Sequence, residues 1–190
     1  MPKKLILLIG APGSGKTTDA KRIASKHEGI ITALSTGELI KNEIKEGTAV
    51  GRIALDFVSK GNLVPTGIIV DTIVTAVNAA PTRVVMLDGF PRKEKQLQYF
   101  GDYLYSHDSI DLISVIEVRV SDETAKERFL ATHDSEATFE HSMKHYKDAL
   151  RDIEKYYENQ HVLKIIDGER DIETVVAEID TYLESICTEF

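Results

Sequence analysis

The chain has 190 residues, a length that suits one domain with its own buried core. Hydrophobic residues make up 42% of it and charged residues 28%, as in globular proteins, and no apolar run is long enough to span a bilayer. The formal net charge of −8 argues against nucleic acids and acidic membranes as partners. A phosphate-bearing ligand would therefore have to be held by positive charge gathered at one place.

The cysteine content and the N-terminus both bear on the compartment. Cys187 is the single cysteine and cannot form an internal disulfide, which agrees with a reducing environment. The basic start at Met1–Lys4 is followed by an apolar run that is too short for a signal peptide and has no cleavage site. We therefore predict a cytoplasmic protein.

The apolar run Leu5–Ile9 predicts a buried strand, and Gly10–Thr17 directly after it fits the phosphate-binding pattern G-x-x-x-x-G-K-[ST]. Glycines let such a loop curl so that its backbone N–H groups point inward and attract phosphates. Lys16 adds a full positive charge, and Thr17 offers a hydroxyl to Mg²⁺. A helix that begins here turns the positive end of its dipole toward the same anion. The stretch predicts a site for a nucleoside triphosphate.

Apolar runs of strand length alternate with segments of helical period along the rest of the chain. Near-continuous apolar strands are typical of a parallel sheet that is covered by helices on both faces. The further runs are Gly29–Leu34, Arg83–Leu87, Leu112–Val118 and Val162–Ile166. Together with the first run, they predict an α/β fold with a five-stranded parallel sheet.

Two regions interrupt this alternation. Residues 36–79 have room for three short helices, separated by Gly47 and by Gly61–Pro65, and predict a flap over one edge of the sheet. Ala131–Ser135 separates two helical segments and predicts a short hinge or a very small cover.

The second of those helical segments has an apolar stripe at three- and four-residue intervals. The stripe consists of Phe139, Met143, Tyr146, Leu150, Ile153 and Tyr157. His141, Ser142 and His145 fall off the stripe, toward solvent or a cleft. The two histidines are spaced i, i+4 and could chelate a metal, but no carboxylate or cysteine partner is evident, which disfavours that interpretation.

An acidic residue, Asp88, ends the apolar run that begins at Arg83. A lone aspartate at a strand end is most often a turn or helix-capping residue. In combination with the phosphate-binding loop, however, it occupies the place where such nucleotide-binding proteins hold the water shell of Mg²⁺. We therefore predict that Thr17 and Asp88 form the metal site.

Several motifs in this order resemble the adenylate kinase family of nucleoside monophosphate kinases, in its bacterial short-lid form, over nearly the whole chain. The matching pieces are Gly10–Thr18, Leu34–Leu39, Gly61–Pro65, Leu87–Arg92 with Gln96, Glu127–Arg128 and Ile166–Gly168. The resemblance implies a single-domain monomer with a core at 1–34, 65–128 and 140–190, an acceptor-binding flap at 35–64 and a reduced lid at 129–139.

The resemblance also implies roles for individual residues. Lys16, Arg92 and Arg128 would neutralise charge during phosphoryl transfer, with Arg92 on the acceptor phosphate and Gln96 on the edge of the adenine. The implied donor-site residues are Gly13, Ser14, Gly15, Lys16, Thr17, Thr18, Arg128 and Arg170. The implied acceptor-site residues are Thr36, Lys41, Asn62, Leu63, Val64, Gly89, Phe90, Pro91, Arg92 and Gln96.

The chain departs from the family pattern in two places. Lys41 stands where the family usually has arginine, and lysine lacks the planar fork that binds phosphate bidentately. The lid segment contains no arginine, and Ser142 stands where a helix arginine is expected. Since each such contact to developing charge is worth about 2.7–4 kcal/mol in comparable sites, we expect slow chemistry. His133, Lys144 or His145 could partly substitute.

The preferred hypothesis is an Mg²⁺-dependent enzyme that reversibly transfers a phosphoryl group from ATP to AMP and gives two ADP. The departures in the lid leave open a non-catalytic nucleotide-binding or sensing protein derived from the same fold. A kinase for another nucleoside monophosphate is a third possibility.

Overall fold

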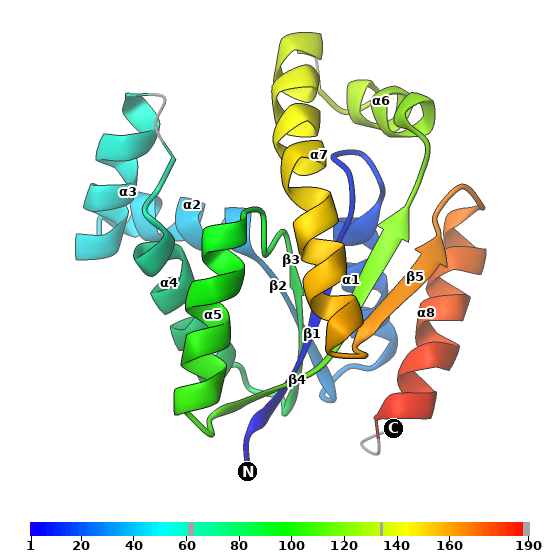
Figure 1. Ribbon diagram of the computed structural model, residues 1–190, viewed down its shortest axis with the longest axis horizontal. Helices are drawn as coiled ribbons and strands as arrows, with labels where there is room; N and C mark the ends of the chain where they lie inside the picture. Colours follow the sequence, from blue (N-terminus) through cyan, green and yellow to red (C-terminus); the bar gives the residue numbers. More distant parts are fainter. Residues whose placement is uncertain (61–62, 134, 188–190) are drawn as a thin grey trace.

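A computed structural model describes residues 1–60, 63–133 and 135–187. The described part of the chain folds around one five-stranded parallel sheet with the strand order β2-β3-β1-β4-β5 (Figure 1). The strands are β1 (Lys3–Ile9), β2 (Ile31–Ser35), β3 (Val84–Asp88), β4 (Ile110–Arg119) and β5 (Leu163–Asp167). All five predicted strands are present, within two residues of the predicted bounds, so the predicted fold class is confirmed.

The helices fill the connections between these strands. They are α1 (Lys16–Lys26), α2 (Thr36–Glu46), α3 (Ala49–Ser59), α4 (Thr66–Ala79), α5 (Glu94–Ser106), α6 (Asp122–Leu130), α7 (Glu136–Asn159) and α8 (Ile172–Ile186). The three short helices predicted between the second and third strands are therefore confirmed as α2, α3 and α4. The predicted division at 35–64 into a flap stays a prediction.

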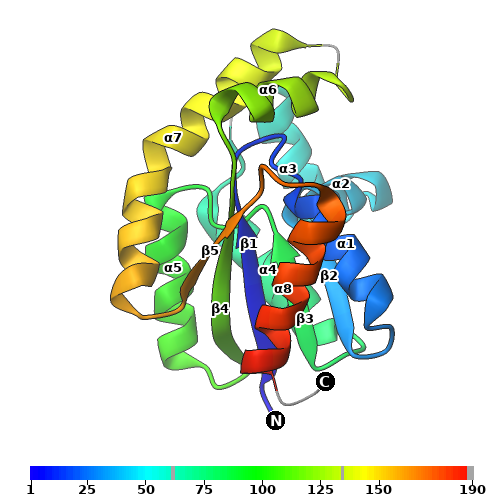
Figure 2. The ribbon, with the colours of Figure 1, turned by 90° about the vertical axis from the view of Figure 1, so that its right-hand side faces the viewer.

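Alternation along β1 explains the layered arrangement. Leu5, Leu7 and Ile9 belong to the core that β1 shares with α4, α5 and α7. Ile6 and Leu8 belong to a second core, on the other face, with α1 and α8. Successive side chains of a strand point to opposite faces, so an unbroken apolar run is buried on both sides. Figure 2 shows α5 and α7 on one side of the sheet and α1 and α8 on the other.

The order of the strands determines where a crevice opens at the edge of the sheet. From β1 the chain passes through α1 to β2 on one side, and after β3 it passes through α5 to β4 on the other side of β1. Loops after neighbouring strands that leave in opposite directions open a crevice at the carboxyl ends of the strands. The β1–β3 register pairs Leu8 with Asp88, so the loops after these two strands start side by side.

The lid segment is short. Helix α6 ends at Leu130 and α7 begins at Glu136, as the interruption predicted at Ala131–Ser135 requires, although Asp134 lies outside the described residues. The hydroxyl of Ser135 caps α7 by accepting a hydrogen bond of 3.2 Å from the backbone N–H of Thr138. In Figure 1 the two helices stand together above the carboxyl ends of the strands.

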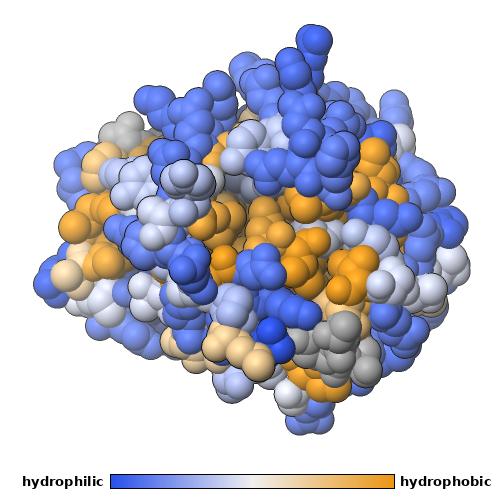
Figure 3. Space-filling view, turned by 60° about the horizontal axis from the view of Figure 1, so that its bottom comes forward, coloured by the Kyte–Doolittle hydropathy of each residue, from blue (hydrophilic) through white to orange (hydrophobic). Residues whose placement is uncertain are grey.

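The surface carries apolar side chains in two settings. On the face shown in Figure 3, hydrophobic residues gather in the middle around a hollow, and hydrophilic residues frame them. Near α3, the large side chains of Ile53, Leu55, Val58 and Leu63 are 45–55% exposed. Among the helices described here, none combines the length and the apolar character that crossing a bilayer requires.

We expect Gly51→Ala to destabilise the protein by about 1–3 kcal/mol, because a Cβ atom there would lie 1.9 Å from the Glu43 carbonyl oxygen where α2 packs against α3. Gly37→Ala in α2 is the control, since its Cβ would meet nothing closer than the Ser35 hydroxyl at 3.9 Å. Urea unfolding followed by circular dichroism measures both variants. Equal midpoints for the two variants would contradict this packing.

Candidate functional site

The phosphate-binding loop between β1 and α1 is shaped by glycine. Gly13 has φ 84°, and a Cβ atom there would lie 2.1 Å from the carbonyl oxygen of Ala125 in α6, so only glycine allows this close approach. The backbone N–H of Ser14 donates to the Ala11 carbonyl at 3.0 Å, and the Lys16 ammonium donates to the same oxygen at 3.1 Å. The loop is therefore curled tightly, with the lysine folded back over it.

The charge of Lys16 is held at an energetic cost in the free protein. Burial lowers the pKa of its ammonium group, the carboxylate of Asp88 partly offsets that effect, and Arg92 adds to it. An anion bound in the loop would oppose this lowering, because it favours the charged form of the lysine. The loop is therefore suited to phosphate.

Asp88 lies at the carboxyl end of β3 and is 4% exposed. The Thr17 hydroxyl donates to its Oδ2 atom, while Oδ1 is buried without a hydrogen-bond partner. The buried hydroxyl of Ser14 also has no partner. Oxygen atoms of this kind are the ligands or water acceptors that Mg²⁺ prefers. The residues present therefore fit a magnesium ion at the place predicted from Thr17 and Asp88.

The loop after β3 arranges the second set of predicted residues. The Arg92 guanidinium donates through Nε to the Gly89 carbonyl at 2.9 Å, and the Arg92 backbone N–H donates to the side-chain carbonyl of Gln96 at 2.7 Å. The Thr36 hydroxyl donates to the Asp88 carbonyl at 3.2 Å. The peptide bond between Phe90 and Pro91 is cis. Gln96 is buried, and because its carbonyl accepts one hydrogen bond within the protein, its two amide N–H donors are the groups best placed to be offered to a base.

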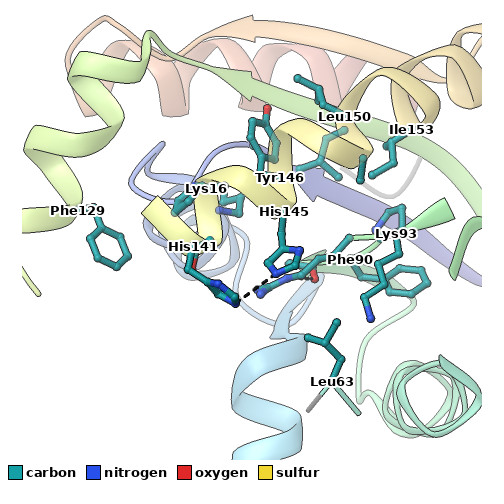
Figure 4. A pocket seen from close by; sticks show the side chains of 18 residues that line it. Lys16, Leu63, Phe90, Lys93, Phe129, His141, His145, Tyr146, Leu150 and Ile153 are labelled. Carbon is teal, nitrogen blue, oxygen red and sulfur yellow. Dashed lines mark hydrogen bonds between the residues drawn. The ribbon is translucent and has the colours of Figure 1, made fainter. Parts of the chain in front are cut away.

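A cavity of about 370 Å³ lies between the phosphate-binding loop, the loop after β3 and α7. It brings together predicted site residues and their direct neighbours from distant parts of the chain. Those from the predicted site are Lys16, Leu63, Gly89, Phe90, Pro91 and Arg92, with Gly10 and Pro12 beside them. The side chains are shown in Figure 4.

Several residues that line this cavity were not predicted as site residues. They are Lys93, Phe129, His141, Ser142 and His145. Tyr146 and Leu150, predicted as part of the core stripe of α7, line the cavity as well, and so does the buried Ile153. The sequence signals for this cleft-facing side were the displacement of His141, Ser142 and His145 from the apolar stripe and the place of Ser142 where the family has an arginine.

Arg128, predicted for the donor site, joins α6 to the phosphate-binding loop and to the loop after β5. Its Nη1 atom donates to the Gly168 carbonyl at 2.9 Å and lies 3.5 Å from the Ser14 carbonyl. Arg170 pairs with Glu178, and that hydrogen bond raises the pKa of the guanidinium. Neither arginine lines the cavity, but Arg128 is directly beside the phosphate-binding loop.

Three further described residues of the predicted site, Thr18, Lys41 and Val64, do not line the cavity. Thr18 and Lys41 are exposed on α1 and α2, and Val64 is half-buried. Asn62 lies outside the described residues.

Of the three residues considered as replacements for lid arginines, only His145 lines the cavity. His133 stacks on Phe129 with ring centroids 4.2 Å apart, and Lys144 donates to Asp148 at 2.6 Å. The two α7 histidines lie with their Nε2 atoms 3.2 Å apart. Within residues 1–60, 63–133 and 135–187, no group of three or more His, Cys, Asp or Glu side chains could hold a metal ion.

Asp19, which sequence reasoning passed over, lies beneath the phosphate-binding loop in α1 and is 2% exposed. Burial raises the pKa of its carboxyl group to about 6, against the opposing attraction of Arg128, Arg22 and Lys16. The folded protein therefore holds this proton more tightly than the unfolded chain does, and the free energy of unfolding falls as the pH rises from about 4 to about 6.

We expect Asp19→Asn to remove that fall. The variant should be more stable than the unmodified protein at pH 7, by about 3 kcal/mol at most, and should gain little near pH 3, where the carboxyl group is largely protonated in both states. Urea unfolding at a series of pH values measures the difference, with the exposed Asp102→Asn as the control. A gain that is the same at both pH values would contradict the raised pKa.

Known proteins of one family are similar to this chain over most of its length. The sequence model of the family described as "Adenylate kinase" matches residues 8–162. A protein named adenylate kinase from Sulfurovum sp. (strain NBC37-1) is 44% identical over 194 residues, covering 96% of this chain and 98% of its own. Proteins of the same name from a Nitratiruptor species and from Campylobacter jejuni (strain RM1221) are each 45% identical, covering 95% and 97% of this chain and 95% and 98% of their own.

Proposed function

This chain belongs to the adenylate kinase family and is an ATP:AMP phosphotransferase, and we propose that it carries out the reaction in the cleft between the phosphate-binding loop and the loop of Arg92. The observation that carries this proposal is that Lys16 and Arg92 line one cavity from two different strand ends. Two cations in one cavity suit two nucleotides whose phosphates must meet.

The chemistry requires positioning and charge neutralisation more than a reactive side chain. Phosphoryl transfer passes through a transition state whose charge is spread over the phosphate oxygens, with the attacking and leaving oxygens in line. We assign Lys16 to the donor phosphates and Arg92 to the acceptor phosphate. Arg128 would hold the donor-side wall through its hydrogen bonds to the carbonyls of Gly168 and Ser14. No nucleophilic side chain is needed, because the acceptor phosphate is the nucleophile.

Magnesium completes the proposed site. Thr17 and Asp88 would hold the ion or its water shell, with the unpartnered Oδ1 of Asp88 as the acceptor. The chemistry that a bound ion would supply there is neutralisation of the negative charge on the phosphates.

We extend the proposal to the parts of the chain that would move and to its state in the cell. Residues 35–64 would close over the acceptor and 129–139 over the donor, which would keep water from accepting the phosphoryl group. The enzyme would act as a monomer in the cytoplasm.

A steady-state assay tests the proposal. The purified protein should convert ATP and AMP to ADP. Lys16→Ala should abolish turnover, and Arg92→Ala should lower kcat/KM by at least about a hundredfold, because each removes a charge from the transition state. Arg151→Ala, an exposed arginine on α7, is the control and should keep the rate of the unmodified protein.

The same assay decides the acceptor and the type of protein. Rates with AMP, GMP, CMP and UMP, measured in parallel, identify the base that the acceptor site prefers. A protein that binds ATP and AMP in calorimetry but transfers no phosphoryl group to any of the four would overturn the proposed activity.

Asp88→Asn should raise the Mg²⁺ concentration needed for half-maximal rate by about 10–100-fold, because an amide oxygen holds the ion or its waters less strongly than a carboxylate does. Titration of the initial rate with Mg²⁺ measures the change. Asp71→Asn, which alters an exposed carboxylate on α4, is the matched control. An unchanged Mg²⁺ dependence in Asp88→Asn would show that the ion is held elsewhere.

A further inference from the structure

The wall of the cleft that α7 provides contains two adjacent histidines. His141 and His145 are one helical turn apart, and both line the cavity together with Lys16 and Arg92. In Figure 4 their imidazoles hang from α7 into the space above Leu63 and beside the loop of Phe90. The opposite side of α7 is fixed by the buried residues Phe139 and Met143, so the side of the helix that carries the two exposed histidines stays toward the cleft.

The two imidazoles form a pair that can hold an additional proton. Their Nε2 atoms are 3.2 Å apart, which is a hydrogen bond in which one ring donates and the other accepts. A neutral pair therefore has a basic nitrogen available. Imidazole is the side-chain group that ordinarily changes its charge between about pH 5 and 8.

The charged groups that line the cavity around the pair are positive, and a bound phosphate would add negative charge to them. Lys16 faces the cavity from α1, and Arg92 and Lys93 face it from the loop after β3. Of the described residues that line it, none is acidic, and on α7 itself only Tyr146 adds a titratable group there. Lys144, on another side of the helix, is paired with Asp148. A polyphosphate in the cavity would bring negative charge close to both imidazoles and would favour a further positive charge there.

The same positive surroundings argue against a metal ion at this pair. A divalent cation bound by two imidazoles would sit among Lys16, Arg92 and Lys93 without a carboxylate to offset the charge. Burial also lowers the pKa of Lys93, as expected of a cation that lacks an anionic partner. The missing component of this cavity is an anion.

We propose that His141 and His145 bind the phosphates of the nucleotides held across the cleft, and that the pair takes up one proton when it does so. This inference rests on the proposed function, because it takes the cavity to be the place where the two nucleotides' phosphates meet. The pair supplies a positive charge on the lid side of the cleft, where the chain has no arginine from Leu130 to Ser142.

Calorimetry with a bisubstrate analogue, two adenosines joined by five phosphates, tests the proposal. All its phosphates are bridging, so it lacks the second phosphate ionisation near pH 6 that would obscure the result. Binding enthalpies measured in buffers of different ionisation enthalpy give the number of protons taken up. The unmodified protein should take up close to one proton near neutral pH, and its Kd should rise by at least about tenfold between pH 6 and pH 8.

Three variants sharpen the test. The double variant His141→Gln/His145→Gln should take up no proton and show less than about a twofold change in Kd between the two pH values. His145→Arg carries a permanent charge and should keep tight binding at pH 8. His107→Gln removes an exposed histidine that stacks on Tyr103, away from the cavity, and should behave as the unmodified protein does.

The failures of the two proposals are distinguishable. Binding of the analogue with the same proton uptake in the unmodified protein and in the double glutamine variant would overturn the role of the pair and leave the proposed function in place. The same holds if Zn²⁺ or Ni²⁺ alone binds the unmodified protein at this pair and analogue binding takes up no proton. No binding of the analogue to the unmodified protein at either pH would overturn both.

Discussion

The hydrogen bond from the Thr17 hydroxyl to the Asp88 carboxylate joins the two strand ends on which the site is built. The β1–β3 register sets Leu8 opposite Asp88, and the chain after β1 must curl through the phosphate-binding loop before Thr17 can reach back to that carboxylate. A carboxylate that is 4% exposed requires compensation from neighbouring donors and cations. Thr17 and Lys16 supply it, so the shape of the loop and the burial of Asp88 depend on each other.

The charged residues that line the cavity also need compensation, in this case from a bound anion. The chain as a whole is acidic, with a formal charge of −8, but the described residues that line the cavity include Lys16, Arg92 and Lys93 and no carboxylate. Burial lowers the pKa of both lysines, so these cations are held at an energetic cost in the free protein. A phosphate group relieves that cost when it enters. The unfavourable placement of these cations in the free protein therefore contributes to the affinity for nucleotides.

Local signals in the sequence predicted most of the fold and part of the cleft. Each strand is an apolar run, the glycine pattern marks the loop at Gly10–Thr17, and Asp88 ends a strand beside it, so these features could be recognised without knowledge of the tertiary structure.

The wall formed by α7 could not be predicted in the same way. Its helical stripe runs from the core at Ile153 and Tyr157 to the cleft at Tyr146, and periodicity alone does not separate packing against the sheet from lining a cavity. Lys93 and Phe129 were missed for a related reason, since their place in the cavity depends on the direction in which α7 crosses the loop after β3 and the end of α6. His141 and His145 gave a partial signal, because both fall off the apolar stripe, and only the packing of the other side of the helix decides between solvent and cleft for them.

The short connection between α6 and α7 explains why, in the proposed mechanism, residues of α7 supply positive charge to the phosphates. Because α6 ends at Leu130 and α7 begins at Glu136, little chain is available to bring charged side chains over the nucleotides from outside. The first turns of α7 then form the cavity wall on that side, through His141, Ser142 and His145. A guanidinium in that position would add another permanent cation to a cavity that already holds Lys16, Arg92 and Lys93, and it would be unfavourable in the free protein. An imidazole pair avoids this, because its charge forms when an anion arrives, and the consequence is a dependence on pH that arginine would not have.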